Sequence, residues 1–199
     1  MPDVDPLLPL GEALKALSAW LRAGKVAGAV IGGVAASVLG RPRMTKDVDV
    51  LVRLEEPRWE SFLREGERWG FVPRLSGAVE FARKSRVLLV RHRPSGVDLD
   101  LTLATLPIED EFLARAKPAE IRGARILLPT PEDLIVMKAI AHRPRDAADI
   151  EAIRDAHPRL DLRRIRRLVR SVATALEQPE LLDDLEALLK HRRGRTRNG

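Results

Sequence analysis

The chain has 199 residues, enough for one well-buried core or for a core with a small appendage. Hydrophobic residues make up 45% and charged residues 32%, a balance that excludes an intrinsically disordered chain. The sequence has no cysteine, which excludes disulfides and thiolate metal sites, and we expect a cytoplasmic protein. The acidic, proline-interrupted start MPDVDPLLPL is unlike a secretory signal, and no apolar run approaches membrane-spanning length, so no membrane partner is expected.

An amphipathic helix is predicted first, over Leu10 to Ala23, because leucines recur there at helical spacing and Gly24 follows as a stop. The apolar run Val26 to Ile31 predicts a strand that leads into the pair Gly32-Gly33. Val34 to Leu39 is Ala-rich and predicts a short helix. We therefore expect a strand, a glycine turn and a helix in succession.

An acidic strand is predicted next, from Asp47 to about Leu54. Residues two apart in a strand point to the same face, so Asp47 and Asp49 project their carboxylates side by side. Such charges repel unless a cation lies between them, and Mg²⁺ prefers carboxylate oxygens together with substrate phosphates. A glycine pair lets the backbone approach a polyphosphate, and the helix N-terminus behind it offers free N–H groups. The stretch therefore indicates a metal–phosphate site.

Each part of this pattern has a plainer interpretation when it stands alone. A single D-x-D usually marks a solvent-facing strand edge, and Gly-Gly is an ordinary turn. The succession of a glycine pair, a short helix and an acidic strand is much rarer, and it favours the metal–phosphate hypothesis.

The middle of the chain is predicted to alternate helix and strand. Pro57 to Trp69 predicts a helix that Gly70 closes, with its aromatic residues in the core. Strands are predicted over Val79 to Ala82, Val87 to Val90 and Val97 to Leu103. After a helix over Glu109 to Ala116, a hairpin over Ala119 to Leu128 turns at Gly123.

The strand Val97 to Leu103 repeats the acidic pattern, with Asp98 and Asp100 on one face and leucines on the other. Acidic residues are poor strand formers, so their presence here needs a reason. One reason is an exposed face. The other is a third carboxylate that faces the pair Asp47 and Asp49 across a metal site.

A second polar constellation follows the helix predicted over Pro131 to Ala141, for which Thr130 is a suitable N-cap. It comprises Lys138, Arg143, Asp146 and Asp149. The plain interpretation is a helix–turn–helix whose ion pairs add little at a surface. For Lys138 itself, an ion pair with Asp146 or Glu132, or extension of the side chain to solvent, is the alternative to a ligand contact.

The C-terminal part is basic. An amphipathic helix after Pro158 carries Arg163, Arg164, Arg166, Arg167 and Arg170 beside its apolar stripe. The net charge of +6 permits a polyanionic partner, although a solvated helix face and a GC-rich genome are the simpler explanations and are favoured for most of the arginines. We predict a core with an N-terminal helix over 1–128, a helical region over 129–190 and a disordered basic tail over 191–199.

Val30 to Val52 resembles the signature of the nucleotidyltransferase superfamily that shares the DNA polymerase β fold. In that signature a Gly-Gly or Gly-Ser pair is followed by an acidic pair on the next strand. The motif Arg43-x-Thr45-x-Asp47-x-Asp49 is similar to the version in AbiEii-type (abortive infection) toxins, although Gly33 and Asp47 are separated by an interval at the long end of the family's range. Lys138 to Ile150 resembles a second AbiEii-like motif, in which a helix lysine precedes a basic residue and K/R-Asp-x-x-Asp.

The resemblance implies an α/β (α+β) fold with a mixed sheet flanked by helices, plus a C-terminal helical region. It implies an Mg²⁺-dependent enzyme with two ions and an NTP co-substrate, which transfers an NMP to a hydroxyl. The metal ligands would be Asp47, Asp49 and Asp100; Asp100 is favoured over Asp98 because the run to Glu109 resembles the segment after the third acid in the family. The triphosphate would contact Gly32, Gly33, Thr45, Lys46, Lys138 and Arg143.

The same resemblance implies a toxin-like enzyme that acts on RNA, such as a tRNA acceptor end, or on a protein, with a possible antitoxin partner. A catalytically weak nucleotide- or RNA-binding module of the same fold is the first alternative, and the intact acids argue against it. The second is a small-molecule nucleotidyltransferase like the aminoglycoside enzymes, for which an acidic cleft would be expected in place of arginines.

Overall fold

The structure, a computed structural model, describes residues 8–190 of the chain. The predicted tail 191–199 lies outside these residues. Within them, the chain forms two compact units, one of residues 8–35 and 44–130 and one of residues 36–43 and 131–190. No helix of the described part of the chain is long and apolar enough to cross a membrane.

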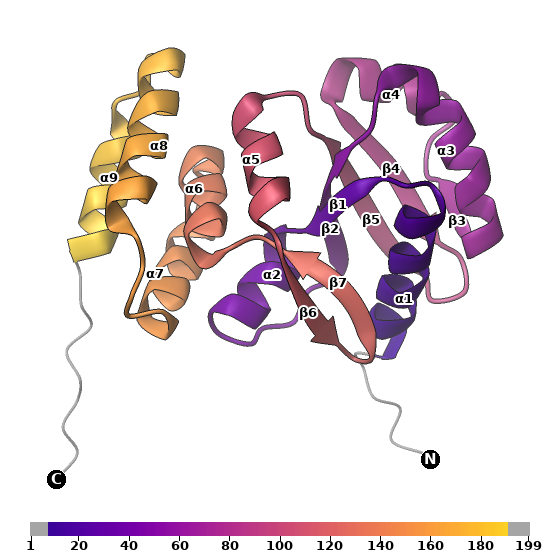
Figure 1. The fold of residues 1–199 in the computed structure, drawn as a ribbon, viewed down its shortest axis with the longest axis horizontal. Coiled ribbons are helices and arrows are strands. Elements are labelled where there is room, and N and C mark those ends of the chain that lie inside the picture. The colour runs from indigo at the N-terminus through magenta and orange to yellow at the C-terminus, as the bar shows by residue number, and fades with distance from the viewer. Residues whose placement is uncertain (1–7, 191–199) are drawn as a thin grey trace, which may run out of the picture. The chain divides into compact units, whose positions relative to one another are not determined.

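The first unit is built on a five-stranded mixed sheet in the order β1-β2-β5-β4-β3 (Figure 1). The strands are β1 (Ala27–Val30), β2 (Asp47–Arg53), β3 (Phe71–Pro73), β4 (Val87–His92) and β5 (Val97–Leu103). The central pair β2 and β5 is parallel, and the other neighbours are antiparallel. This confirms the predicted mixed sheet, with β5 at the predicted bounds.

The helices of this unit are α1 (Leu8–Ala23), the start of α2 (Gly32–Leu39), α3 (Trp59–Gly66), α4 (Ala78–Ser85) and α5 (Pro107–Arg115). Short 3₁₀ turns at Glu56–Arg58 and Glu67–Trp69 flank α3, so the helix predicted over this stretch is present in three pieces. Gly70 ends it with φ +82°, a conformation that glycine adopts without strain.

Aromatic stacking joins α1 to α3 and the sheet. Trp20 of α1 is fully buried between Phe62 and Phe71, with ring centroids 4.1 and 4.8 Å away. The Trp20 indole N–H donates to the carbonyl of Phe62 at 3.1 Å, so its one polar atom is satisfied. The expectation that the aromatic residues of this stretch lie in the core is confirmed for Phe62 and Trp59, whereas Trp69 is only half-buried.

One prediction for the middle of the chain was wrong, and one strand was missed. Val79 to Ala82 is part of helix α4, not a strand, and the buried residues Ala78 and Ala82 lie about one helical turn apart. The edge strand β3 was not predicted, since three residues ending in Pro73 give too short a pattern. The hairpin is present as β6 (Lys117–Ile121) and β7 (Ala124–Leu128), and β7 runs beside α1 and β1 (Figure 1).

The second unit is helical. It contains the end of α2 and the helices α6 (Pro131–Ala141), α7 (Asp146–Ala156), α8 (Leu162–Leu176) and α9 (Glu180–Lys190). Helix α6 has the predicted bounds. Its Asp133 is fully buried and accepts from Arg164 of α8 at 2.8 Å, which joins the two helices by a charge-assisted hydrogen bond.

Candidate active site

Four aspartates share one face of the two central strands. In the parallel pair, Asp47 lies opposite Asp98 and Asp49 lies opposite Asp100. The residues that alternate with them, such as Val48 and Leu99, are fully buried on the other face. Because paired residues on neighbouring strands point the same way, all four carboxylates project from a single surface of the sheet.

Gly32, at the start of α2, lies directly against this surface. Its φ is +59°, and a Cβ added to it would lie 1.9 Å from Oδ2 of Asp49. The neighbouring N–H of Ile31 donates to the carbonyl of Asp49 at 2.8 Å, which ties the turn to β2. Only glycine satisfies both the backbone conformation and the space, so the first turn of α2 and the Asp49 carboxylate are built as one unit.

Arg74, which sequence reasoning did not identify, contacts this surface. Its Nη1 lies 3.2 Å from Oδ2 of Asp98, and its Nη2 donates to Oδ1 of Asp100. Arg74 follows the edge strand β3, and its N–H donates to the carbonyl of Leu89 at 3.0 Å. Since Leu89 is the β4 residue opposite Asp100, this bond places the arginine where its long side chain reaches across β4.

A second arginine neutralises Asp98. Arg91, its partner on β4, donates from Nε at 2.6 Å and from Nη2 at 2.9 Å to the two oxygens of Asp98. These hydrogen bonds, followed by the nearby charge of Arg74, outweigh burial and hold the pKa of Asp98 below its usual value. Both oxygens of Asp98 are therefore already engaged by guanidinium groups.

Asp100 differs from Asp98 in both contact and ionisation. Burial raises the pKa of Asp100, and the nearby carboxylates of Asp47 and Asp98 add to the rise, while Arg74 partly opposes it. Within residues 8–190, its Oδ2 accepts no hydrogen bond. Asp100 therefore keeps one oxygen for another ligand.

The carboxylates fit a magnesium site in the kind of donor and in the face they share, since Mg²⁺ is held by carboxylate oxygens and substrate phosphates. The side chains of the described residues nevertheless do not bring three acids or histidines together as a formed metal site. Arg74 occupies part of the space beside Asp100. The kind of donor therefore fits Mg²⁺. A bound ion would have to share the Asp100 carboxylate with Arg74.

The other predicted nucleotide contacts fall into the two units. Thr45 and the exposed Lys46 lie on the segment that enters β2, and Gly33 follows Gly32 in α2. Lys138 and Arg143 belong to the second unit.

Lys138 is buried in the second unit and has two carboxylate partners. Its Nζ donates to Asp146 at 2.9 Å and to Asp149 at 2.7 Å. The Arg143 N–H donates to the other oxygen of Asp146 at 3.2 Å, while the Arg143 side chain is exposed. These contacts are those of the ion-pair alternative, which we adopt for Lys138. The predicted contact of Lys138 or Arg143 with a triphosphate is not tested by them.

Arg43, whose side chain is 36% exposed, completes this group. Its Nε and Nη2 donate to the two oxygens of Asp149 at 3.1 and 3.0 Å. Burial opposes the ionisation of Asp149, but the hydrogen bonds from Arg43 and Lys138 together outweigh it and lower the pKa of this carboxyl. The Arg43 of the sequence motif thus contacts the aspartate that ends the second motif.

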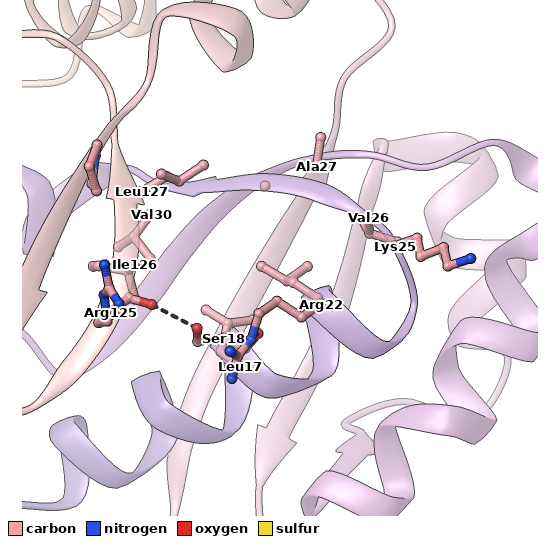
Figure 2. A pocket seen from close by; sticks show the side chains of 13 residues that line it. Leu17, Ser18, Arg22, Lys25, Val26, Ala27, Val30, Arg125, Ile126 and Leu127 are labelled. Atoms are coloured by element: carbon pink, nitrogen blue, oxygen red, sulfur yellow. Dashed lines mark hydrogen bonds between the residues drawn. The ribbon is translucent and has the colours of Figure 1, made fainter.

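A groove of about 540 Å³ lies elsewhere on the first unit, between α1, β1 and β7 (Figure 2). Its walls are mainly apolar, and Ser18 donates there to the carbonyl of Arg125 at 2.7 Å. Among the described residues that line it there is no acid, no histidine and none of the predicted site residues. The described lining of the groove therefore lacks the carboxylates that a metal–phosphate site requires, despite the volume of the groove.

The family "Nucleotidyl transferase of unknown function (DUF2204)" matches residues 11–187 of the sequence. The chain belongs to this family. It is therefore a nucleotidyltransferase, as the resemblance of Val30 to Val52 to that superfamily's signature implied. The match does not bear on the closer similarity to AbiEii-type toxins.

Solved structures support the fold. An antigenic nucleotidyltransferase-like protein from Paracoccidioides brasiliensis is similar over 90% of this chain and 93% of its own, at 17% identity and a TM-score of 0.57. The antibiotic-resistance factor ANT(2'')-Ia is similar over 85% of this chain and 96% of its own, at 19% identity and a TM-score of 0.56. At these identities the likeness shows the nucleotidyltransferase fold and no substrate. No curated protein is significantly similar in sequence.

Proposed function

We propose that the enzyme transfers a nucleoside monophosphate from an NTP to an acceptor hydroxyl, and that the acceptor is an RNA. The observation that carries the proposal is the surface shared by four aspartates, one of which, Asp49, lies directly against the Gly32 turn. A carboxylate surface that binds metal, next to a backbone turn that can approach phosphates, suits phosphoryl chemistry, which depends on positioning and charge neutralisation.

Asp47, Asp49 and Asp100 are the proposed metal ligands, for two Mg²⁺ ions. The choice of Asp100 over Asp98 follows from their contacts, because Arg91 and Arg74 engage both oxygens of Asp98. When bound, the ions stabilise the attacking and leaving oxygens. Gly32, Gly33, Thr45 and Lys46 are the proposed contacts of the triphosphate.

In the proposed reaction, the acceptor oxygen attacks the α-phosphorus and a new P–O bond forms. The bond from the α-phosphorus to the oxygen that bridges it to the β-phosphorus breaks, and pyrophosphate leaves with that electron pair. Asp100 orients the hydroxyl and accepts its proton through the oxygen that has no partner within residues 8–190.

The RNA acceptor is supported by α8, a helix with five arginines and no acidic residue between Leu162 and Leu176. Arg164 and Arg166 have carboxylate partners in Asp133 and Glu186. The remaining three, Arg163, Arg167 and Arg170, are exposed and have no carboxylate partner in the described part of the chain.

These three arginines, here called the α8 stripe, lie on one face because their spacing is four and then three residues. They span about 10 Å along the helix. A row of exposed guanidinium groups suits a phosphate backbone, where Arg supplies charge and forked hydrogen bonds. A small cationic acceptor such as an aminoglycoside would be repelled by it.

The test is transfer of label from each α-³²P-labelled NTP to total RNA with Mg²⁺, followed by separation of RNA, protein and small molecules. We expect label in one RNA class with one preferred NTP. Label in protein, or only in an added aminoglycoside, would overturn the RNA acceptor, and absence of transfer to any of them would overturn the activity.

The α8 stripe has a matched control. Replacing its three arginines by glutamine should reduce the salt dependence of RNA binding by about two in log–log slope, since each phosphate contact of a single strand contributes about 0.7. Arg166→Gln removes an arginine of the same helix that is held by Glu186 at 2.6 Å, and we expect little change. Equal effects of the two variants would remove the support for the stripe.

A toxin role with an antitoxin partner is the further step that the AbiEii-like motifs suggest. It predicts that expression of the chain arrests growth and that Asp49→Asn abolishes the arrest. Arrest that persists in the Asp49→Asn variant would separate toxicity from transfer.

A further inference from the structure

We infer that Arg74 is a resident counter-ion of the third carboxylate, which holds Asp100 in the free enzyme and suppresses metal binding until a nucleotide arrives. The inference rests on the proposed function, because it concerns the same carboxylates. It assigns a role to a residue outside both sequence motifs.

The first support is the way in which the fold aims Arg74. Its backbone N–H is bonded to Leu89, the residue that faces Asp100 across the β4–β5 ladder. The side chain then reaches Asp100 and Asp98 with separate nitrogens. Because this backbone bond fixes position 74 beside β4, a basic residue at a neighbouring position would not make the same contact with Asp100 and Asp98.

The second support is the role that this arrangement gives to Asp98. Arg91 grips both oxygens of Asp98, and Oδ2 of Asp98 also lies 3.2 Å from Nη1 of Arg74. The order Arg91, Asp98, Arg74, Asp100 alternates in charge, so each carboxylate lies between or beside cations. Asp98 thus anchors the arginine, which explains why a second acid is present on β5.

The third support is that Arg74 is bound only at one end of its guanidinium. Within residues 8–190, its Nε is buried without a hydrogen-bond partner. The resting contact therefore leaves the Nε donor unsatisfied. Buried polar groups are rarely left unpaired, so this one needs an explanation. The charge of an incoming phosphate attracts the guanidinium away from Asp100, and once the side chain has moved, a phosphate oxygen is an acceptor suited to Nε.

The consequence for metal binding has a definite sign. A guanidinium and a divalent cation repel each other when both contact Asp100, so the arginine lowers the affinity of the free enzyme for metal. A triphosphate adds negative charge that attracts both cations. Metal and nucleotide are then expected to bind together more tightly than either binds alone.

A purely structural role for Arg74 predicts the opposite sign. If the arginine only positioned Asp100, its loss would leave the carboxylate poorly placed and metal binding would weaken. The direction of the change in metal affinity therefore separates the two roles.

The experiment is a titration of the nucleotide-free protein with Mn²⁺, with free Mn²⁺ measured by electron paramagnetic resonance. Arg74→Gln should bind Mn²⁺ roughly tenfold more tightly than the wild type, because a nearby positive charge is removed. Arg74→Lys keeps the charge and should bind like the wild type. Arg91→Gln removes a cation that contacts Asp98 alone and should change the affinity by less than about twofold.

The controls separate this inference from the proposed function. Circular dichroism and thermal melts establish that each variant is folded, and Arg74→Met, which also removes the charge, serves if glutamine destabilises the chain. If Mn²⁺ binding by the wild type and by Arg74→Gln is unaffected by Asp49→Asn, the carboxylate surface is not the metal site and the proposed function fails. If Asp49→Asn abolishes binding but Arg74→Gln weakens it or leaves it unchanged, only the role of Arg74 is overturned. Absence of Mn²⁺ binding in both the wild type and Arg74→Gln also overturns the role of Arg74.

Discussion

Two clusters of two cations and two aspartates occur among the described residues of this molecule, and they differ in the exposure of their carboxylates. The sheet cluster of the first unit comprises Arg74, Arg91, Asp98 and Asp100, and the helix cluster of the second unit comprises Arg43, Lys138, Asp146 and Asp149. The two carboxylates of the helix cluster, Asp146 and Asp149, are 8 and 10% exposed, and those of the sheet cluster, Asp98 and Asp100, are 25 and 36% exposed. The side chain of Lys138 is 7% exposed, whereas that of Arg43 is 36% exposed.

The two clusters also differ in their surroundings. The helix cluster pairs two cations with two carboxylates. The sheet cluster lies on the same surface as two further aspartates, Asp47 and Asp49. A cluster of paired charges stabilises a fold when all its members are present, whereas an accessible carboxylate surface suits a metal ion. The same residue types thus serve structure in one unit and a candidate site in the other.

Removal of the accessible carboxylate should have the largest effect on transfer. Asp100→Asn keeps the shape of the side chain but removes the proton acceptor, and we expect transfer to fall by about 10²–10⁴-fold. Asp98→Asn should lower transfer by less than about tenfold, because Arg91 and Arg74 already engage both of its oxygens. Initial rates at saturating Mg²⁺ and NTP measure both. A larger loss of transfer in Asp98→Asn than in Asp100→Asn would mean that Asp98, two residues earlier on β5, is the metal ligand.

Removal of Lys138 should act on stability. Lys138→Met leaves Asp146 and Asp149 buried without this partner, and we expect a loss of about 3 kcal/mol in the free energy of unfolding. Urea denaturation followed by circular dichroism measures it. Lys84→Met, at an exposed position of α4, is the matched control and should change stability by less than about 0.5 kcal/mol. Equal losses in the two variants would show that the helix cluster adds no specific stability.

The Gly32 turn can be tested against another glycine with similar backbone geometry. Gly32→Ala and Gly96→Ala both place a side chain at positive φ, +59° and +72°, at a cost of about 1–2 kcal/mol. Gly96 has open space around it, whereas a Cβ at Gly32 meets the Asp49 carboxylate at 1.9 Å. We therefore expect Gly32→Ala to be the more destabilising and also to abolish transfer, with Gly96→Ala fully active. Similar behaviour of the pair in melts and rate assays would contradict the close packing of turn and carboxylate.

The helix cluster should also make a small, pH-dependent contribution to the free energy of unfolding. Asp149 has a lowered pKa in the folded state, so its contribution is fully present above its ordinary value of 3.8 and is lost as pH falls through the folded-state pKa. The difference in unfolding free energy between wild type and Asp149→Asn should be constant from about pH 5 to 7 and shrink below about pH 4. Denaturation curves at a series of pH values measure this difference. A difference that grew on acidification would contradict the assigned ion pairs.

Much of the fold could be predicted because its elements have clear periods. β5 alternates acidic and apolar residues along its length, and α6 begins with a strong N-terminal signal at Pro131, so both have the predicted bounds. The four residues Val79 to Ala82 are too few to separate a helical from a strand period, and β3 is shorter still.

The candidate site was predictable to the extent that it lies on local patterns. Asp47 shares a face with Asp49, and Asp98 with Asp100, because of strand alternation, which a sequence displays directly. The two pairs lie on one surface because β2 and β5 are paired in parallel. Arg74 was missed because its contact with Asp100 depends on the pairing of β3, β4 and β5, and nothing nearby distinguishes it among 35 basic residues. Tertiary pairing, not sequence spacing, gives that arginine its role.

Thermal melts with and without Mg²⁺ and the preferred NTP test the contrast between the two clusters most directly. The wild type should be stabilised by the ligands, Asp49→Asn should lose that shift while keeping its ligand-free melting temperature, and Lys138→Met should melt lower but keep the full shift. A shift retained by Asp49→Asn, or lost by Lys138→Met, would contradict the assignment of binding to the sheet surface and of stability to the helix cluster.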